Sequence, residues 1–232
     1  MITLRAGQTH NVSLDGDMDI TEASADSVTA WYLSGGIASA VTAYTLKGAA
    51  SQAASYVNLA NPGTYDLAPG VAPTWDTTNG LIFNGTNQYL TTGIVPDISG
   101  PAWSYFARYT NFTAGSDMLI GVANATHGMY IRPTTGGGAT VHYFHGQGAA
   151  LIGPSHLTGT LAIAGLNGYR DGVFDVAIPA AAIGSLVIPI FVAAYNANGS
   201  PSNYGAFYLQ YLSVYNTTIT APQVAALHAA TV

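Results

Sequence analysis

The stretch NGLIFNGTNQYLTTG, residues 79–93, can be interpreted either as a structural element of the fold or as a ligand-binding loop. Two apolar runs, residues 81–83 and 89–90, flank a polar stretch, residues 84–88, whose side chains favour turns. This pattern predicts two short strands joined by a tight connection. A polar loop between aromatic residues would equally suit the rim of a sugar-binding site. The candidate ligand-binding residues are Asn84, Thr86, Asn87 and Tyr89.

The composition of the chain limits what it can bind. Of its 232 residues, 49% are hydrophobic and only 7% are charged, against about 25% charged in an ordinary soluble domain. A chain of this length and hydrophobicity can bury a sizeable core as one large β domain. With five basic residues and a net charge of −6, it is a poor partner for nucleic acid or for anionic membranes.

The chain has no cysteine, which excludes disulfides and thiolate metal sites. Its first residues, MITLRAGQTHNV, include no apolar segment of the kind found in secretory signals, so we expect none. Residues 176–195 have the length and apolarity of a membrane span. They contain two prolines and a Gly-Ser pair and have no flanking Lys or Arg, so we predict two short buried strands there instead.

Strand signals dominate the rest of the chain. Residues 103–110, 140–145 and 206–215 are rich in β-branched and aromatic residues, and the Asn167-Gly168 and Asp171-Gly172 pairs are hairpin signals. One helix is well signalled, at the C-terminus, where Thr220 can cap it and Pro222 lies in its first turn. Many short strands with turn residues between them predict an all-β sandwich with one short C-terminal helix.

The first 36 residues differ from the remainder. They hold five of the eleven acidic residues and end in Gly35-Gly36, which offers a hinge. We interpret residues 1–36 as an N-terminal extension or attachment arm and residues 37–232 as the sandwich.

The acidic run in this extension has the spacing of a calcium-binding loop. However, Ile20 stands where such a loop needs Gly, and an Asp replaces the usual bidentate Glu, so a solvated acidic loop explains the run as well. We expect no cofactor and keep Ca²⁺ as an alternative. Its candidate metal ligands are Asp15, Asp17, Asp19 and Asp26.

Four segments together resemble a known fold family. They are AVTAYTL at residues 40–46, GLIFNGTNQYL at residues 80–90, and the closing pieces GYRDGV and FYLQYLSVYNTTITAPQVAALHAA at residues 168–173 and 207–230. Their order resembles laminin-G-like, concanavalin-A-like sandwich domains of the kind found in phage structural proteins. The resemblance implies a jelly-roll β-sandwich, and it favours a structural role for residues 79–93. It says little about function, since this fold hosts lectins, hydrolases and structural modules.

The acidic residues argue against catalysis. Glycosidases need two carboxyl groups about 5–9.5 Å apart, and a strand would supply them as alternating acidic residues. The chain has one glutamate, Glu22, and the alternating aspartates of residues 15–19 lie in the extension. The aspartates of the sandwich are isolated in sequence, and Asp171 is explained by its turn. We therefore expect no enzymatic activity.

The histidines and tyrosines leave function open. His142 and His145 fall on opposite faces of a regular strand, and no carboxylate has the spacing to complete a metal set. The 15 tyrosines can stack on sugars or fill strands and protein interfaces.

The function expected from these features is a non-enzymatic virion structural protein, such as a capsid decoration or a fibre or tail module. It would be made in the host cytoplasm and act on the virion exterior as a homo-oligomer, contacting the major capsid protein or a fibre or tail neighbour. The first alternative is an extracellular carbohydrate-binding, lectin-like module that binds cell-surface glycan. The second is a glycoside hydrolase.

Overall fold

A computed structural model describes residues 30–98, 102–113, 118–135, 140–180, 184 and 186–232. The chain divides into two units, Met1–Ala30 and Trp31–Val232. The described residues from Trp31 onward belong to the second unit, and the candidate calcium ligands of residues 15–26 lie outside the described residues. The attachment role of residues 1–36 stays a prediction.

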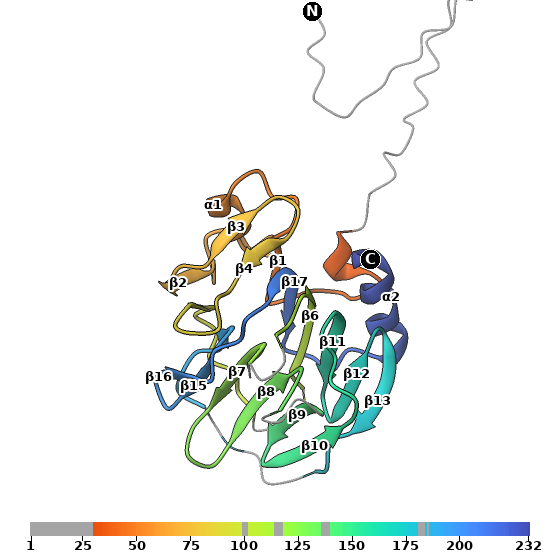
Figure 1. Ribbon diagram of the computed structural model, residues 1–232. Helices are drawn as coiled ribbons and strands as arrows, with labels where there is room; N and C mark the ends of the chain where they lie inside the picture. The colour runs from red at the N-terminus through yellow and green to blue at the C-terminus, as the bar shows by residue number, and fades with distance from the viewer. Residues whose placement is uncertain (1–29, 99–101, 114–117, 136–139, 181–183, 185) are drawn as a thin grey trace, which may run out of the picture. The chain divides into compact units, whose positions relative to one another are not determined.

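The described residues form two antiparallel-dominated sheets (Figure 1). The first sheet has the order β13-β12-β11-β6-β17-β4-β3, and β1 also pairs with β17. Its strands are β1 (Thr42–Thr45), β3 (Thr74–Asp76), β4 (Gly80–Ile82), β6 (Ser104–Thr110), β11 (Gly159–Ala164), β12 (Asn167–Arg170), β13 (Val173–Ala177) and β17 (Tyr208–Tyr215).

The second sheet has the order β10-β9-β8-β7-β14-β5-β2, and β15 pairs with both β7 and β16. Its strands are β2 (Ala68–Val71), β5 (Tyr89–Thr91), β7 (Ile120–Ala123), β8 (Gly128–Arg132), β9 (Val141–Gly146), β10 (Gly148–Ile152), β14 (Phe191–Val192), β15 (Tyr195–Ala197) and β16 (Ser200–Ser202). The predicted all-β sandwich is confirmed.

The main core lies between the sheets. Inward-facing residues alternate with outward-facing ones along each strand, so that Ile120, Ile131 and Tyr143 of the second sheet are fully buried in this core. Tyr105, Leu161 and Val214 face them from the first sheet and are also fully buried.

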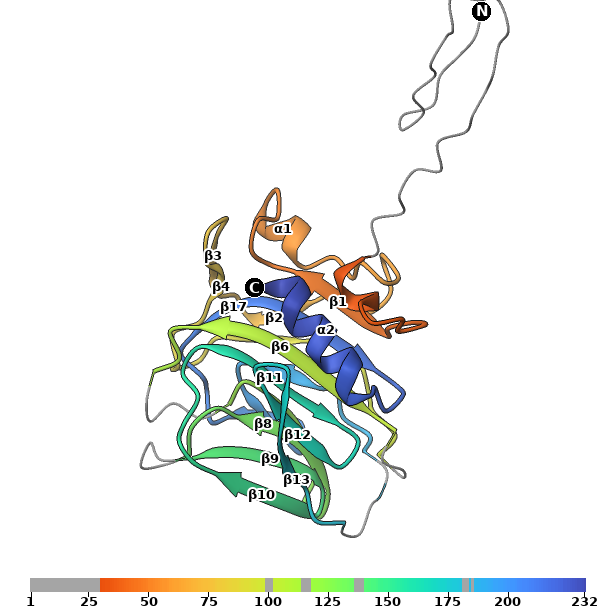
Figure 2. The ribbon, with the colours of Figure 1, turned by 90° about the vertical axis from the view of Figure 1, so that its right-hand side faces the viewer.

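A second, smaller core covers the outer face of the first sheet. The C-terminal helix α2 (Ala221–Thr231) and the short 3-10 helix η1 (Trp31–Leu33) lie there, and Figure 2 shows α2 running across β6 and β11. Val224 and Leu227 of α2 pack against Phe106 and Ala162 of the sheet. The helix begins as predicted, with Thr220 as its N-cap and Pro222 in its first turn. A further short helix, α1 (Gln52–Ser55), lies in the alanine-rich segment at residues 49–56.

Of the two hairpin signals in the sequence, one forms the expected turn and the other does not. Asp171 and Gly172 both have positive φ and form the tight β12–β13 turn, as the Asp-Gly pair predicts. Asn167-Gly168, by contrast, lies inside β12, because the two preceding residues, Gly165 and Leu166, form the β11–β12 turn. Gly165 supplies the positive φ that this turn requires, so the Asn-Gly pair is free to enter the strand.

The segment at residues 79–93 connects the two sheets. Its strands are β4 and β5, but β4 belongs to the first sheet and β5 to the second, so they are not a hairpin. Phe83 is buried and stacks near Phe207, while the loop at residues 84–88 carries the chain across the edge of the sandwich. Among the described residues, no helix has the length and apolarity that crossing a bilayer would require.

Candidate functional site

The candidate site lies on the outer face of the second sheet. The register places Thr91, Phe191, Gly121, Tyr130 and Phe144 opposite one another across β5, β14, β7, β8 and β9. Directly opposed residues of antiparallel strands share a face, and the neighbouring register positions Leu90, Val192 and Ile120 face the main core. The aligned set therefore faces away from that core.

Aromatic rings follow this line, and we call them the aromatic row: Tyr89, Phe191, Tyr195, Tyr130 and Phe144. Tyr130 and Phe144 stack with ring centroids 4.5 Å apart and planes 4° apart. Tyr195 meets Tyr130 edge-on at 5.4 Å, and Tyr89 packs against Phe191 at 4.8 Å. Such offset and edge-on pairs are favoured by the ring quadrupole.

Glycines let these rings lie close to the sheet. A Cβ on Gly121 would lie 2.7 Å from the Tyr130 Cβ and 3.5 Å from the Tyr195 ring. A Cβ on Gly70 would lie 2.0 Å from the Tyr89 ring. Any side chain at Gly70 would displace the Tyr89 ring, and one at Gly121 would crowd Tyr130 at its Cβ, so the absence of side chains at both positions shapes the row.

The rings of the row are shielded by each other rather than by the core. Phe191 is 7% exposed and Tyr130 is 9% exposed, yet neither belongs to a core cluster. Tyr89, Phe144 and Tyr195 remain half-buried, so each presents part of its ring to solvent. A run of aromatic rings on an outer sheet face is an arrangement suited to binding a ligand.

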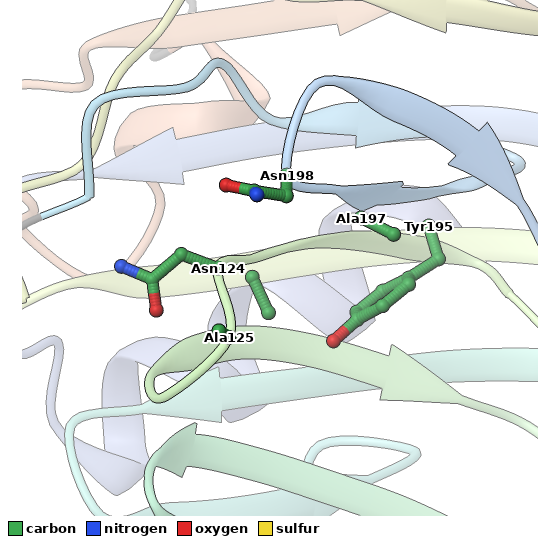
Figure 3. A pocket seen from close by; sticks show the side chains of 6 residues that line it. Asn124, Ala125, Tyr195, Ala197 and Asn198 are labelled. Carbon is green, nitrogen blue, oxygen red and sulfur yellow. The ribbon is translucent and has the colours of Figure 1, made fainter.

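A small hollow opens beside the row where β15 pairs with β7. Its volume is about 160 Å³, below the roughly 300–1,000 Å³ of pockets for drug-sized ligands. Figure 3 shows the Tyr195 ring on one side and the Asn124 and Asn198 side chains on the other. Its lining contains no charged side chain and consists of Ala123, Asn124, Ala125, Tyr195, Ala197 and Asn198.

The polar groups of the hollow are held by local backbone structure. Asn198 has φ 54°, a conformation that Asn tolerates better than most residues, and its N–H donates to the Ala123 carbonyl at 2.9 Å. The Asn124 Oδ1 accepts hydrogen bonds from the N–H groups of Thr126 and His127 at 2.9 and 2.8 Å. The Asn124 amide is therefore positioned before any ligand arrives, and the backbone from which the Asn198 side chain projects is fixed.

The hydroxyls and the imidazole of this face stay neutral near pH 7. Burial, with a smaller effect from Tyr195, raises the pKa of Tyr130 to about 12, although Arg132 opposes the rise. Burial likewise raises the pKa of Tyr195. Burial and the nearby Arg132 charge lower the pKa of His142 to about 4. The tyrosine hydroxyls can thus both donate and accept hydrogen bonds.

His142 and His145 point to opposite faces of β9, as the sequence predicts. His142 opposes Arg132 on the outer face, while His145 opposes Met129 of the core. His145 is 1% exposed, and neither of its ring nitrogens has a hydrogen-bond partner among the described residues. Burial lowers the pKa of His145, so it is held as a neutral ring.

The loop proposed as a sugar-binding rim is largely occupied with its own hydrogen bonds. The Asn84 Oδ1 accepts from the N–H groups of Thr86 and Asn87, and the Asn84 amide donates to the Asn87 Oδ1 at 3.1 Å. The Gln88 Oε1 accepts from the Asn84 N–H. Tyr89 is different, because it belongs to the aromatic row. The structure thus brings Tyr89 to the candidate site and places Asn84, Thr86 and Asn87 in a loop beside it.

Two acidic residues have partners that sequence spacing did not reveal. The Asp171 Oδ2 lies 2.8 Å from the Nε2 of His156, whose Nδ1 lies 2.9 Å from the buried Tyr109 hydroxyl. The Asp175 Oδ2 accepts from Arg170 and Tyr143. His156 is isolated in sequence but meets Asp171 because the β12–β13 turn folds back on the loop before β11.

The hydrogen bonds of Asp171 connect the turn of the β12–β13 hairpin to the body of the sandwich. Burial raises the pKa of Asp171, but the Thr160 N–H and His156 more than offset this, so that the pKa lies below its usual value. Tyr109 is fully buried, and the buried His156 ring lies between it and the half-exposed Asp171. Among the described residues, no group of three or more His, Cys, Asp or Glu side chains could hold a metal ion.

No protein-family model and no curated protein matches the sequence. The fold itself is similar to solved structures. Trypanosoma rangeli sialidase in complex with 2,3-difluorosialic acid matches 82% of this chain with a TM-score of 0.54 and 15% identity. Domain 4 of AbnA, a GH43 extracellular arabinanase from Geobacillus stearothermophilus, in complex with arabinotriose, matches 82% of this chain with a TM-score of 0.52 and 13% identity. A mutant of HCR/D matches 82% of this chain with a TM-score of 0.55 and 9% identity.

The fraction of each solved structure that this chain spans differs. This chain spans 32% of the sialidase, 52% of HCR/D and 98% of the arabinanase domain. At these identities the likeness shows the fold alone, which is consistent with a concanavalin-A-like sandwich.

These neighbours correct one expectation. The prediction that the chain is not an enzyme is wrong, because proteins with this fold include a sialidase and an arabinanase, both glycoside hydrolases. That prediction relied on the missing pair of neighbouring acidic residues in the sequence. The fold brings together side chains that are distant in sequence, as Asp171 and His156 demonstrate, so spacing alone was an insufficient ground.

Proposed function

We propose that this sandwich recognises carbohydrate, with the hollow beside Tyr195 as the position of one sugar unit. The observation that carries the proposal is the combination in one uncharged hollow of a half-buried Tyr195 ring with the amides of Asn124 and Asn198. Sugars have apolar ring faces that stack on aromatic side chains and hydroxyls that bond to amides.

Two further features support carbohydrate over a charged ligand. The lining carries no ionised group, and Tyr130 and Tyr195 are neutral at pH 7, since the ordinary pKa of tyrosine is about 10 and burial raises both pKa values further. The arabinanase domain with a similar fold was solved with arabinotriose bound. The virion setting stays a prediction; a position of the gene beside capsid and tail genes would support it.

The test measures binding of arabinotriose, xylotriose and cellotriose by calorimetry to the full chain and to Asn198→Gly. Glycine accepts the positive φ of residue 198 and removes the side chain that carries the amide, so we expect affinity to fall about tenfold without loss of folding. Asn111→Gly is the matched control, because Asn111 is also exposed with φ 55° and lies at the end of β6. Equal affinity of Asn198→Gly and the parent chain would contradict the proposed site.

The same oligosaccharides also test for turnover. Incubation with the full chain followed by chromatography separates recognition alone from hydrolysis. If products form, Asp171→Asn and Asp175→Asn identify whether either carboxyl group takes part. Absence of both binding and hydrolysis for neutral glycans would contradict the proposed function.

A further inference from the structure

The aromatic row is much longer than the hollow. It crosses β5, β14, β7, β8 and β9, which are successive neighbours in the second sheet. At about 4.8 Å per strand, these four steps cover about 19 Å. A single sugar unit in the hollow would contact Tyr195 and leave the rings at both ends of the row unused.

We infer that the ligand is a linear, uncharged glycan that lies across the strands along the aromatic row, with one of its units in the hollow. This inference rests on the proposed function and names the class of carbohydrate: a chain of several units rather than a terminal sugar. Each half-buried ring of the row would stack on a different unit of the chain.

Two tyrosines of the row lie against different strands of the second sheet. Tyr89 lies over Gly70 of β2, and Tyr195 lies beside Gly121 of β7. Gly70 and Gly121 belong to strands far apart in sequence, yet in both cases a bare backbone leaves room for a tyrosine ring. Packing of the main core does not need these glycines, because the rings lie on the opposite face.

The ends of the row differ in what surrounds them. At one end Tyr204 packs beside Tyr89 at 6.3 Å, and a Cβ on Gly85 of the loop at residues 84–88 would lie 2.8 Å from the Cβ of Ala206, two residues after Tyr204. At the other end, Phe144 is followed by Ala149 of the edge strand β10. The Tyr89 end therefore offers tyrosine hydroxyls along with rings, and the Phe144 end offers a ring with the His142 imidazole beside it at 6.1 Å.

The experiment measures the affinities of linear arabino-, xylo- and cello-oligosaccharides of two to six units for the full chain, Tyr89→Ala and Phe144→Ala. In the series that binds, we expect affinity to rise at least about tenfold from the disaccharide to the longest chain, because each added ring contact contributes. Each variant should remove part of that gain and leave the affinity for the disaccharide within about twofold.

Tyr208→Ala is the control, because Tyr208 is half-buried in β17 of the first sheet. Tyr89→Leu keeps an apolar side chain if Tyr89→Ala unfolds, and thermal unfolding checks both. Affinity that is independent of chain length, or that falls equally for every length in Tyr89→Ala and Phe144→Ala, would overturn the inference while leaving the proposed function standing. No binding of any length would overturn both.

Sedimentation velocity of the full chain adds an independent outcome. If the aromatic row instead binds a second copy, the chain self-associates and Phe144→Ala shifts it to a monomer. That result would also overturn the inference.

Discussion

Both sheets carry aromatic side chains on their outer faces, but a helix covers those of the first sheet and leaves those of the second sheet open. On the first sheet, Phe106, Tyr169 and Tyr215 are covered by α2 and η1 and form a second core. On the second sheet, Tyr130, Phe144 and Tyr195 are covered by nothing among the described residues except neighbouring side chains and short loops. One face has been closed with a helix, and the other has been left open with its rings partly in solvent.

We interpret the covered face as a contribution to stability and the open face as a surface for binding. Burial of apolar surface beneath a helix stabilises the fold by roughly 25 cal/mol per Å² removed from water. Rings that stay half-exposed contribute less to folding, and their remaining surface is available to a ligand. We therefore expect substitutions under α2 to change the free energy of unfolding, and substitutions along the aromatic row to change binding more than stability.

The largest expected effect is that of Leu227→Ala beneath α2. Leu227 is fully buried in the second core, so its truncation should lower the free energy of unfolding by about 2–5 kcal/mol. Leu151→Ala on the second sheet is the matched control, because Leu151 is 59% exposed and a surface change away from special features costs within about 0.5 kcal/mol. Urea unfolding of both variants measures the difference. Similar losses for the two leucines would refute the contrast between the faces.

A smaller effect is expected from Gln223→Ala at the start of α2. The Gln223 Oε1 accepts a hydrogen bond from the Thr220 N–H at 2.8 Å, which satisfies one of the free donors at the helix N-terminus. Its removal should cost about 0.5–1 kcal/mol. The control is Gln147→Ala, since Gln147 is exposed between β9 and β10 of the second sheet. A loss below that of the control would mean that the capping bond does not support the helix that closes the first face.

The sequence predicted the covered face better than the open one. Helix α2 is signalled locally, by Thr220, Pro222 and the alanine-rich segment that follows. The Asp171-Gly172 turn and the strand at β6 are likewise local patterns. The separation of β4 and β5 into different sheets was missed, because a polar loop between two apolar runs is the same whether the chain turns back or crosses to the other sheet.

The open face depends on register, which composition does not reveal. Of the aromatic row, only Tyr89 was identified as a candidate from sequence. Phe191 meets Gly121, and Gly121 meets Tyr130, through pairings between strands about 10 to 70 residues apart. The useful signal was present at Gly70 and Gly121, since glycine inside a strand often marks the close approach of another group. The acidic network of Asp171 and His156 was hidden for the same reason.

The smallest expected effect is a difference in how the two faces respond to acid. In the described residues the second core contains only tyrosines as titratable side chains, whereas the outer face of the second sheet carries His142, with a pKa lowered from 6.5 to about 4. A histidine whose pKa is lowered by folding binds fewer protons in the folded state. It therefore contributes stability that is fully present above pH 6.5 and is lost as the pH falls toward 4.

We expect His142→Phe to reduce the slope of unfolding free energy against pH between 6.5 and 4. Phenylalanine keeps a ring beside Tyr130 and Phe144, which His142 meets edge-on at 5.1 and 6.1 Å. Because His142 is half-buried, solvent screens its charge and the change should be modest. His127→Phe is the control, since His127 is also half-buried but lies outside the aromatic row. Urea unfolding at several pH values gives both slopes. An unchanged slope in His142→Phe would show that the open face is not what makes the sandwich sensitive to acid.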